Sequence, residues 1–189
     1  MKIKLFGTKI QCSFLFLAII SIVVFTDKTT FALPMLIAVI LHETAHLVVM
    51  KMLGVQPKEI LLLPAQITII RDFSASNKKE TLISLAGPFL NIVLFTTFYK
   101  LKPEFAVINL LFGLFNLLPV KGLDGGEILA NLIAKVFNQN TAELTLKIIN
   151  IVIGVVGIFV GITLIFSGKI NFSLIIISIY FLLSAIVKL

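Results

Sequence analysis

Charged residues are scarce in this chain. They make up 13% of its 189 residues, whereas 59% are hydrophobic, and a typical soluble domain has roughly a quarter of its residues charged. A surface this poor in charge would not stay in water, so we expect lipid to be the main solvent of the chain. The length allows a single membrane-embedded domain over residues 1–189, without a separate soluble module beside several membrane spans.

Cysteine is almost missing as well. The single Cys12 excludes an intrachain disulfide and a cysteine-based metal cluster. Because Cys12 lies in an apolar stretch, we expect its thiol to behave as a small buried hydrophobic group.

Long apolar stretches, in contrast, are abundant. A helix needs roughly 20 apolar residues to cross a hydrocarbon core about 30 Å thick. We therefore predict an all-α polytopic membrane protein with about six transmembrane helices, of which the fourth is short. The six stretches are residues 10–26, 31–53, 81–99, 104–118, 147–166 and 171–187.

The placement of basic residues orients these spans. With the N-terminus inside, twelve of the 16 Lys and Arg residues fall on the inner side, in agreement with the positive-inside rule. The net charge of +7 is thus a topology signal, and no nucleic-acid partner is expected. We expect a multi-pass protein of a bacterial cell membrane with a cytoplasmic N-terminus. The first stretch also resembles a signal peptide with a cleavage site at residues 30–32, but its bulky Phe16 and Phe25 favour an uncleaved anchor.

Two inner segments differ from simple loops. Residues 60–70 are too short to cross the membrane, contain Pro64 and are rich in β-branched residues. They predict a short β hairpin or edge strand at the membrane face. After Gly126, apolar residues recur on one helical face and polar residues on the opposite face, which predicts an interfacial helix.

Both histidines of the chain lie in one apolar stretch, in the sequence His42-Glu-Thr-Ala-His46. At positions i and i+4 of a helix, the two imidazoles share a face and could bind one metal ion, with Glu43 placed to accept a proton from water. An acidic residue at the centre of a span costs about 2.5–3.5 kcal/mol on insertion scales. A functional role is therefore favoured over a polar contact between Glu43 and a lysine of another span.

Catalytic zinc usually has three protein ligands and an open position for water. With no third histidine, the remaining ligand should be a carboxylate. Depth in the membrane favours Asp124, which follows the fourth stretch on the inner side among glycines that allow sharp turns. From spacing alone, however, Asp124 is equally well explained as a turn residue or a helix cap. The candidate carboxylates are Asp27, Glu59, Asp72, Glu80, Glu104, Asp124, Glu127 and Glu143.

Three sequence elements together resemble the two motifs of a known family. HETAH at residues 42–46 matches HExxH, and NLLP at 116–119 with LDGG at 123–126 matches NxxPxxxxDG. These are the paired motifs of the site-2 protease family of intramembrane metalloproteases, which the chain resembles. Within it, the chain is most similar to the branch of stage IV sporulation protein FB. The resemblance covers a three-helix catalytic core at about residues 31–126, with extra helices at 10–26, 147–166 and 171–187.

The resemblance implies functional roles for individual residues. It implies one Zn²⁺ per chain, bound by His42, His46 and Asp124, with Glu43 as the catalytic acid/base. The family also carries a Gly-Pro-x-x-Asn element, which residues 87–91 match. By resemblance, Asn91 and Asn116 help to bind substrate near the zinc. From the residues alone, Asn91 could equally form a hydrogen bond between helices, and Asn116 could cap its helix.

The chain also departs from the family. Thr44 and Ala45 stand where the family often has Leu or Phe followed by Gly, which leaves the ligands unchanged. The chain stops at Leu189, without the C-terminal nucleotide-sensing module that is common in the sporulation branch, so ATP regulation through such a module is not expected.

Together these features predict an intramembrane zinc endopeptidase that acts in regulated intramembrane proteolysis. Its partners would be the lipid bilayer, a transmembrane or membrane-associated substrate protein, and a membrane inhibitor or regulator. The substrate must offer an unwound segment, because a helix occupies its own carbonyls, and residues 60–70 would receive it by strand addition. Two alternatives are a transporter or ion site, disfavoured by the lack of an inverted repeat, and an inactive protease-like scaffold, disfavoured by the intact motif residues.

Overall fold

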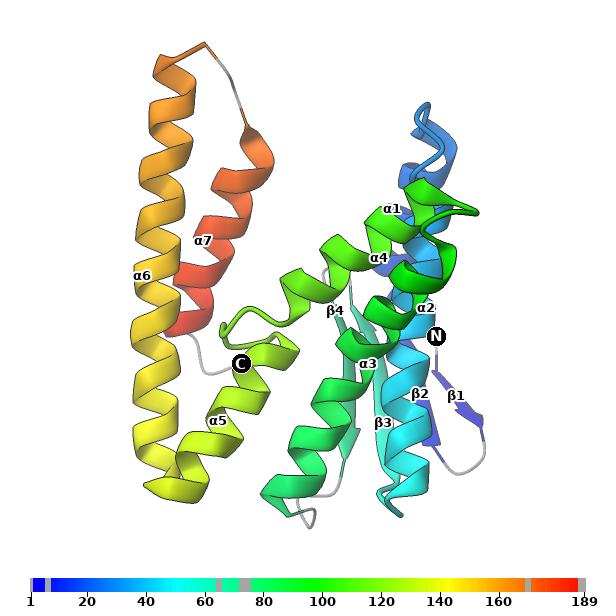
Figure 1. Cartoon of the computed structure of the whole chain (residues 1–189), viewed down its shortest axis with the longest axis vertical. Coiled ribbons are helices and arrows are strands. Elements are labelled where there is room, and N and C mark those ends of the chain that lie inside the picture. Colours follow the sequence, from blue (N-terminus) through cyan, green and yellow to red (C-terminus); the bar gives the residue numbers. More distant parts are fainter. Residues whose placement is uncertain (1, 6–7, 64–65, 72–75, 169–170, 187–189) are drawn as a thin grey trace. The chain divides into compact units, whose positions relative to one another are not determined.

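The computed structural model describes residues 2–5, 8–63, 66–71, 76–168 and 171–186. The chain divides into two compact units, Met1–Phe115 and Asn116–Leu189, and the expected core at residues 31–126 has parts in both. Figure 1 labels the elements of each unit. In chain order they are β1 (Lys2–Leu5), β2 (Thr8–Cys12), α1 (Phe14–Thr26), α2 (Ala32–Met52), β3 (Pro57–Leu63), β4 (Gln66–Arg71), α3 (Asn77–Phe98), α4 (Pro103–Asn116), α5 (Asp124–Val136), α6 (Gln139–Phe166) and α7 (Phe172–Ile186).

The first unit contains a four-stranded sheet in the order β1-β2-β3-β4. The β1–β2 and β3–β4 pairs are antiparallel, whereas β2 and β3 are parallel. Parallel strands need a crossover connection, and α1 and α2 supply it. The hairpin predicted at residues 60–70 is therefore present as β3 and β4. The predicted helical fold with a short β hairpin is confirmed in its coarse form, but β1 and β2 are two further strands that the prediction did not include.

The first apolar stretch starts with a strand and not with a helix. Residues 10–12 were expected to open the first span, but they pair with β3. The side-chain amide of Gln11 donates to the carboxylate of Glu59, which ties the two strands together beyond their backbone bonds. Ser13 then begins the helix, because its hydroxyl accepts from the amide of Phe16 at 3.0 Å.

Asp27 fixes the connection between α1 and α2. Its carboxylate accepts hydrogen bonds from the hydroxyl and the amide of Thr29 and from the amide of Ala32. These bonds, that of the Thr29 hydroxyl above all, hold the pKa of Asp27 below its usual value, because they stabilise the charged form. The carboxylate therefore has a structural use at the start of α2.

A small apolar core joins α2, α3 and the sheet. Met50 of α2 and Ile83 of α3 are buried, and Ile69 of β4 packs against them. The buried residues of α2 recur every fourth position, at Ala38, His42, His46 and Met50. The apolar core at Met50 therefore sets the face of α2 on which both histidines lie.

Among the described residues, α2, α3 and α6 are long and apolar enough to cross a membrane. Helices α1, α4 and α7 have 13, 14 and 15 residues, so each is about 20–23 Å long, less than the roughly 30 Å of hydrocarbon. The count of six spans therefore stays a prediction. Large apolar side chains such as Phe25, Phe89 and Phe159 are exposed on these helices, as expected of surfaces that contact lipid.

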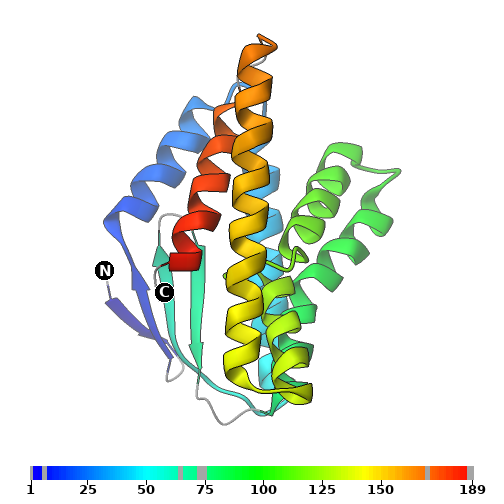
Figure 2. The ribbon, with the colours of Figure 1, turned by 90° about the vertical axis from the view of Figure 1, so that its left-hand side faces the viewer.

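Helices α5, α6 and α7 form the second unit. The amphipathic segment predicted after Gly126 is helical, as α5. Helix α6 begins at Gln139 and not at residue 147, because the side chain of Asn138 accepts from the amide of Thr141 at 2.8 Å and caps it. Figure 2 shows α6 and α7 side by side and antiparallel. Glycines permit this approach, since a Cβ at Gly154 would lie 2.6 Å from Leu182.

Candidate metal centre

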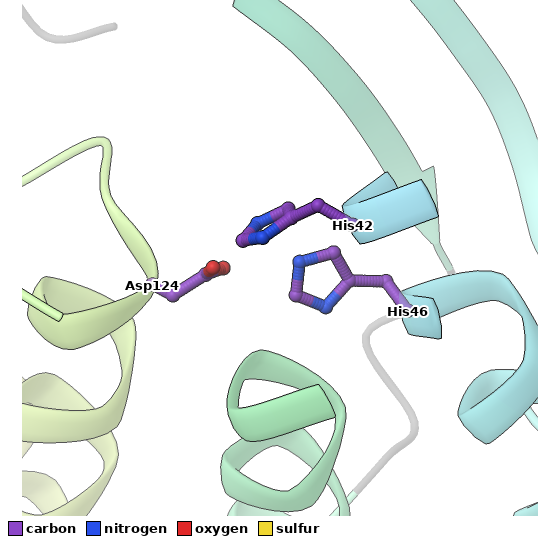
Figure 3. A group of neighbouring side chains, drawn as sticks. All are labelled: His42, His46 and Asp124. Atoms are coloured by element: carbon purple, nitrogen blue, oxygen red, sulfur yellow. The ribbon is translucent and has the colours of Figure 1, made fainter. Parts of the chain in front are cut away.

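The two histidines lie on one face of α2, as their spacing predicts. Their ring centroids are 4.8 Å apart and their planes meet at 81°, and Figure 3 shows the two rings next to each other. His42 is 2% exposed and His46 is 6% exposed. Two buried imidazoles in an apolar helix are costly unless their polar atoms have partners.

Each imidazole has an oxygen partner at its Nδ1 atom. Nδ1 of His46 lies 2.7 Å from the carbonyl oxygen of Ile83. Because a carbonyl only accepts, this Nδ1 carries the proton. Nδ1 of His42 forms a hydrogen bond with Oδ1 of Asn91. Metal-binding histidines almost always donate their second ring N–H to an oxygen in this way, which leaves the lone pair on Nε2.

Gly87 of α3 provides space beside both Nε2 atoms. A Cβ at residue 87 would lie 2.5 Å from Nε2 of His46 and 2.6 Å from Nε2 of His42. The two nitrogens therefore converge on one small volume, at a backbone position where only glycine fits. Gly87 belongs to the Gly-Pro-x-x-Asn element at residues 87–91, but the sequence alone does not show this clearance.

A second buried asparagine, which sequence reasoning missed, lies behind Asn91. Nδ2 of Asn91 donates to Oδ1 of Asn109 at 2.8 Å, and Nδ2 of Asn109 donates to the carbonyl of Phe105 at 2.8 Å. Both asparagines are fully buried. Gly113 allows α4 to approach α3 here, because a Cβ at Gly113 would lie 2.9 Å from Cβ of Asn91. The available signal was an amide in the middle of the apolar stretch 104–118.

Two further residues, Glu43 and Phe112, complete the first unit's part of the site. Glu43 follows His42 on α2 and is partly exposed. The ring of Phe112 on α4 contacts the His42 ring edge to face, with centroids 4.9 Å apart. Both polar atoms of the Asn91 side chain bond to protein groups, so these contacts support positioning of His42. Substrate binding by Asn91 stays a prediction.

Asp124 and Asn116 are in the second unit. Asn116 is the last residue of α4, and its predicted substrate role is not tested by this position. Asp124 is the first residue of α5, and Figure 3 shows its carboxylate at that end of the helix. Gly125 and Gly126 let the preceding loop fold tightly onto α5, because a Cβ at either position would lie 2.1 Å from a backbone carbonyl oxygen.

The other candidate carboxylates have different places in the structure. Asp27 holds the start of α2, and Glu59 accepts from Gln11 in the sheet. Glu80 and Glu104 lie in the first turns of α3 and α4, where a negative charge interacts favourably with the helix dipole. Asp72 lies outside the described residues.

Comparisons with known proteins agree with metal binding by the two histidines. The model of peptidase family M50 matches residues 99–161. Zinc metalloprotease MJ0392 of Methanocaldococcus jannaschii is 31% identical over 112 residues, which are 52% of this chain and 33% of that protein. Rip3 of Mycobacterium tuberculosis, provisionally named as a zinc metalloprotease, is 32% identical over 114 residues, which are 51% of this chain and 29% of Rip3. The matches thus span about a third of these relatives.

A solved structure extends the comparison to almost the whole chain. The site-2 protease from Methanocaldococcus jannaschii matches with a TM-score of 0.74 and 22% identity, over 98% of this chain and 93% of that one. The structural match shows that the chain has a site-2 protease fold. The sequence matches show that residues 99–161 are similar to peptidase family M50 and that about half of the chain is similar to proteins named as zinc metalloproteases. The narrower assignment to the sporulation branch stays a prediction.

Proposed function

We propose that the chain is a zinc-dependent endopeptidase that cleaves peptide bonds of membrane proteins within the bilayer. The observation that carries this proposal is the convergence of Nε2 of His42 and Nε2 of His46 beside Gly87. This convergence occurs in α2, which is apolar and long enough to cross a membrane. The names of the matching relatives and of the family model favour the same activity.

The donor set fits zinc. Two neutral imidazoles and one carboxylate form a common set of three protein ligands at catalytic zinc sites. We assign the carboxylate to Asp124 because the LDGG motif accompanies HETAH in the family that the chain resembles. Zinc at such a site would polarise the scissile carbonyl and make a water molecule more acidic.

The chain's own residues account for the proton transfers. Glu43 accepts a proton from the attacking water and delivers it to the nitrogen of the departing amine, so it ends each cycle in its starting state. His42 and His46 are held by their Nδ1 bonds and do not need to reorient during the reaction. The substrate presents an extended segment, because helical carbonyls are already occupied.

The decisive experiment combines metal analysis with a cleavage assay on the purified full chain. Wild type and Glu43→Gln are each expected to contain about one zinc, and only wild type is expected to cleave a membrane-tethered substrate, since Gln keeps the shape of Glu but cannot take up the proton. Cleavage by Glu43→Gln near the wild-type rate would refute the acid/base role. Loss of zinc from this variant would instead identify Glu43 as a ligand.

The cytoplasmic N-terminus and the six-span arrangement belong to the same proposal. They are supported by the distribution of basic residues and are tested with single cysteines in a Cys12→Ser background, labelled by a membrane-impermeant maleimide. Lys28→Cys should be labelled in intact cells, whereas Lys78→Cys and Lys121→Cys should be labelled only after permeabilisation. Strong labelling of Lys78→Cys in sealed cells would contradict the proposed orientation.

A further inference from the structure

We infer that Asn109 is a positioning residue that determines, through Asn91, which nitrogen of His42 carries the proton. The three side chains form a continuous hydrogen-bonded relay from α4 through α3 to α2. The consequence of this relay for metal binding rests on the proposed function. The relay itself is a property of the first unit and can be measured without metal.

The direction of the relay is set at its far end by the backbone of α4. Nδ2 of Asn109 lies 2.8 Å from the carbonyl oxygen of Phe105. A backbone carbonyl has no hydrogen to donate, so Asn109 must turn its amide nitrogen toward it. The side chain of Asn109 has one nitrogen and one oxygen at its end, and its oxygen therefore faces Asn91.

The same rule fixes Asn91 and then His42. The oxygen of Asn109 requires a donor, which Asn91 provides with Nδ2 at 2.8 Å. Oδ1 of Asn91 consequently faces His42 and accepts from Nδ1. Turning the Asn91 amide over would place its oxygen against the oxygen of Asn109. With the Asn91 amide turned over, His42 would accept a hydrogen bond at Nδ1 and carry its proton on Nε2. A metal ion could not bind to the protonated Nε2.

Burial makes the reversed orientation of either amide costly. Asn91 and Asn109 are both fully buried, and in apolar surroundings an amide that faces the wrong partner is costly. His46 differs from His42, because its Nδ1 donates directly to the backbone carbonyl of Ile83. The Nδ1 partner of His42 is therefore a side chain that can be replaced, whereas the Nδ1 partner of His46 is a backbone carbonyl that a substitution of Ile83 does not remove.

The test uses the chain's two histidines as its only imidazole signals. We propose ¹⁵N NMR of the metal-free full chain in detergent, labelled at the histidine ring nitrogens, because protonated and unprotonated ring nitrogens give well-separated signals. Wild type should show both histidines protonated at Nδ1 only. In Asn109→Leu, the His42 signals should move toward a mixture of the two tautomers while those of His46 remain. Asn91→Leu should give the same shift.

Asn150→Leu is the matched control for the spectra of the metal-free chain, and it is not used as a control for zinc affinity. It removes another fully buried amide, from α6, and should leave all four ring nitrogens as in wild type. Zinc affinity provides a second readout. Asn91→Leu should weaken it by about 10–100-fold, the usual effect of losing an outer partner of a ligand, and Asn109→Leu by about 10-fold.

Two results would overturn the relay. One is a wild-type spectrum with the His42 proton on Nε2, which decides the matter even if the variants do not fold. The other is an unchanged His42 tautomer in folded Asn109→Leu. If wild type binds no zinc, the proposed function fails, but the spectra still decide whether the relay exists.

Discussion

Replacing Gly87 by Ala should remove zinc binding without unfolding the first unit. The added Cβ would lie 2.5 Å from Nε2 of His46 and 2.6 Å from Nε2 of His42, whereas ordinary contacts of this kind begin at 3.4 Å. The rings must therefore retreat by about 0.8–0.9 Å, or α2 and α3 must separate by a similar amount. The methyl group would also occupy the volume on which the two nitrogens converge.

A shift of this size is large on the scale of a zinc site. Zinc–nitrogen bonds are about 2.0–2.1 Å long, and deviations beyond roughly 0.2 Å are incompatible with a genuine site. Loss of an outer partner alone already costs about 10–100-fold in affinity, so the direct displacement of two ligands should cost about 100-fold or more. The extra methyl group should lower the free energy of unfolding by about 1–3 kcal/mol through overpacking. The better helix propensity of Ala offsets about 1 kcal/mol of this loss.

The assay is a zinc titration against a competing chelator, with thermal unfolding in the same detergent. Phe89→Ala is the control on the same helix, because Phe89 is 67% exposed and its removal changes more volume without approaching the imidazoles. Gly87→Ala should lose zinc and stay folded, whereas Phe89→Ala should keep it. Gly87→Ala that binds zinc as tightly as wild type would refute the convergence of the two Nε2 atoms.

Two other substitutions test the second unit. Asp124→Ala should release the zinc. Glu127→Ala is its control and should retain the zinc, because it removes a carboxylate one turn further along α5. Full zinc occupancy in Asp124→Ala would show that another residue is the third ligand. Asn150→Leu should lower the unfolding temperature and weaken zinc binding. Asn150 accepts from the amide of Lys121 at 3.0 Å and donates to Ser184 at 2.8 Å, and these two bonds anchor the loop before Asp124. The loss of such buried hydrogen bonds costs about 1–3 kcal/mol, and unchanged thermal unfolding of Asn150→Leu would argue against this anchor.

Local periodicity was sufficient for several features. The spacing of His42 and His46 predicted a shared helical face because 3.6 residues complete a turn, and nothing distant is needed for that result. The β-branched run at residues 60–70 predicted a hairpin, and the apolar face after Gly126 predicted α5. Each of these follows from the preferences of neighbouring residues in the chain.

Other features were decided by segments far apart in the sequence. Strand β2 forms because the β3–β4 hairpin offers an edge with which it pairs in parallel, and β1 pairs in turn with β2. An apolar run alone does not distinguish a strand from a helix. The early start of α6, in contrast, has a local cause, because Asn138 caps the helix through the amide of Thr141 three residues on.

At the candidate metal centre, the sequence by itself determined which donor types are present and that both histidines share one face of a helix. Only the tertiary structure showed that Asn91 orients His42, that Asn109 stands behind Asn91, and that Gly87 leaves room beside Nε2. The partner of His42 is 49 residues away in the chain. The physical reason is that the direction of a hydrogen bond and the clearance beside an atom depend on how α2, α3 and α4 pack together, and packing is specified by all of these helices jointly.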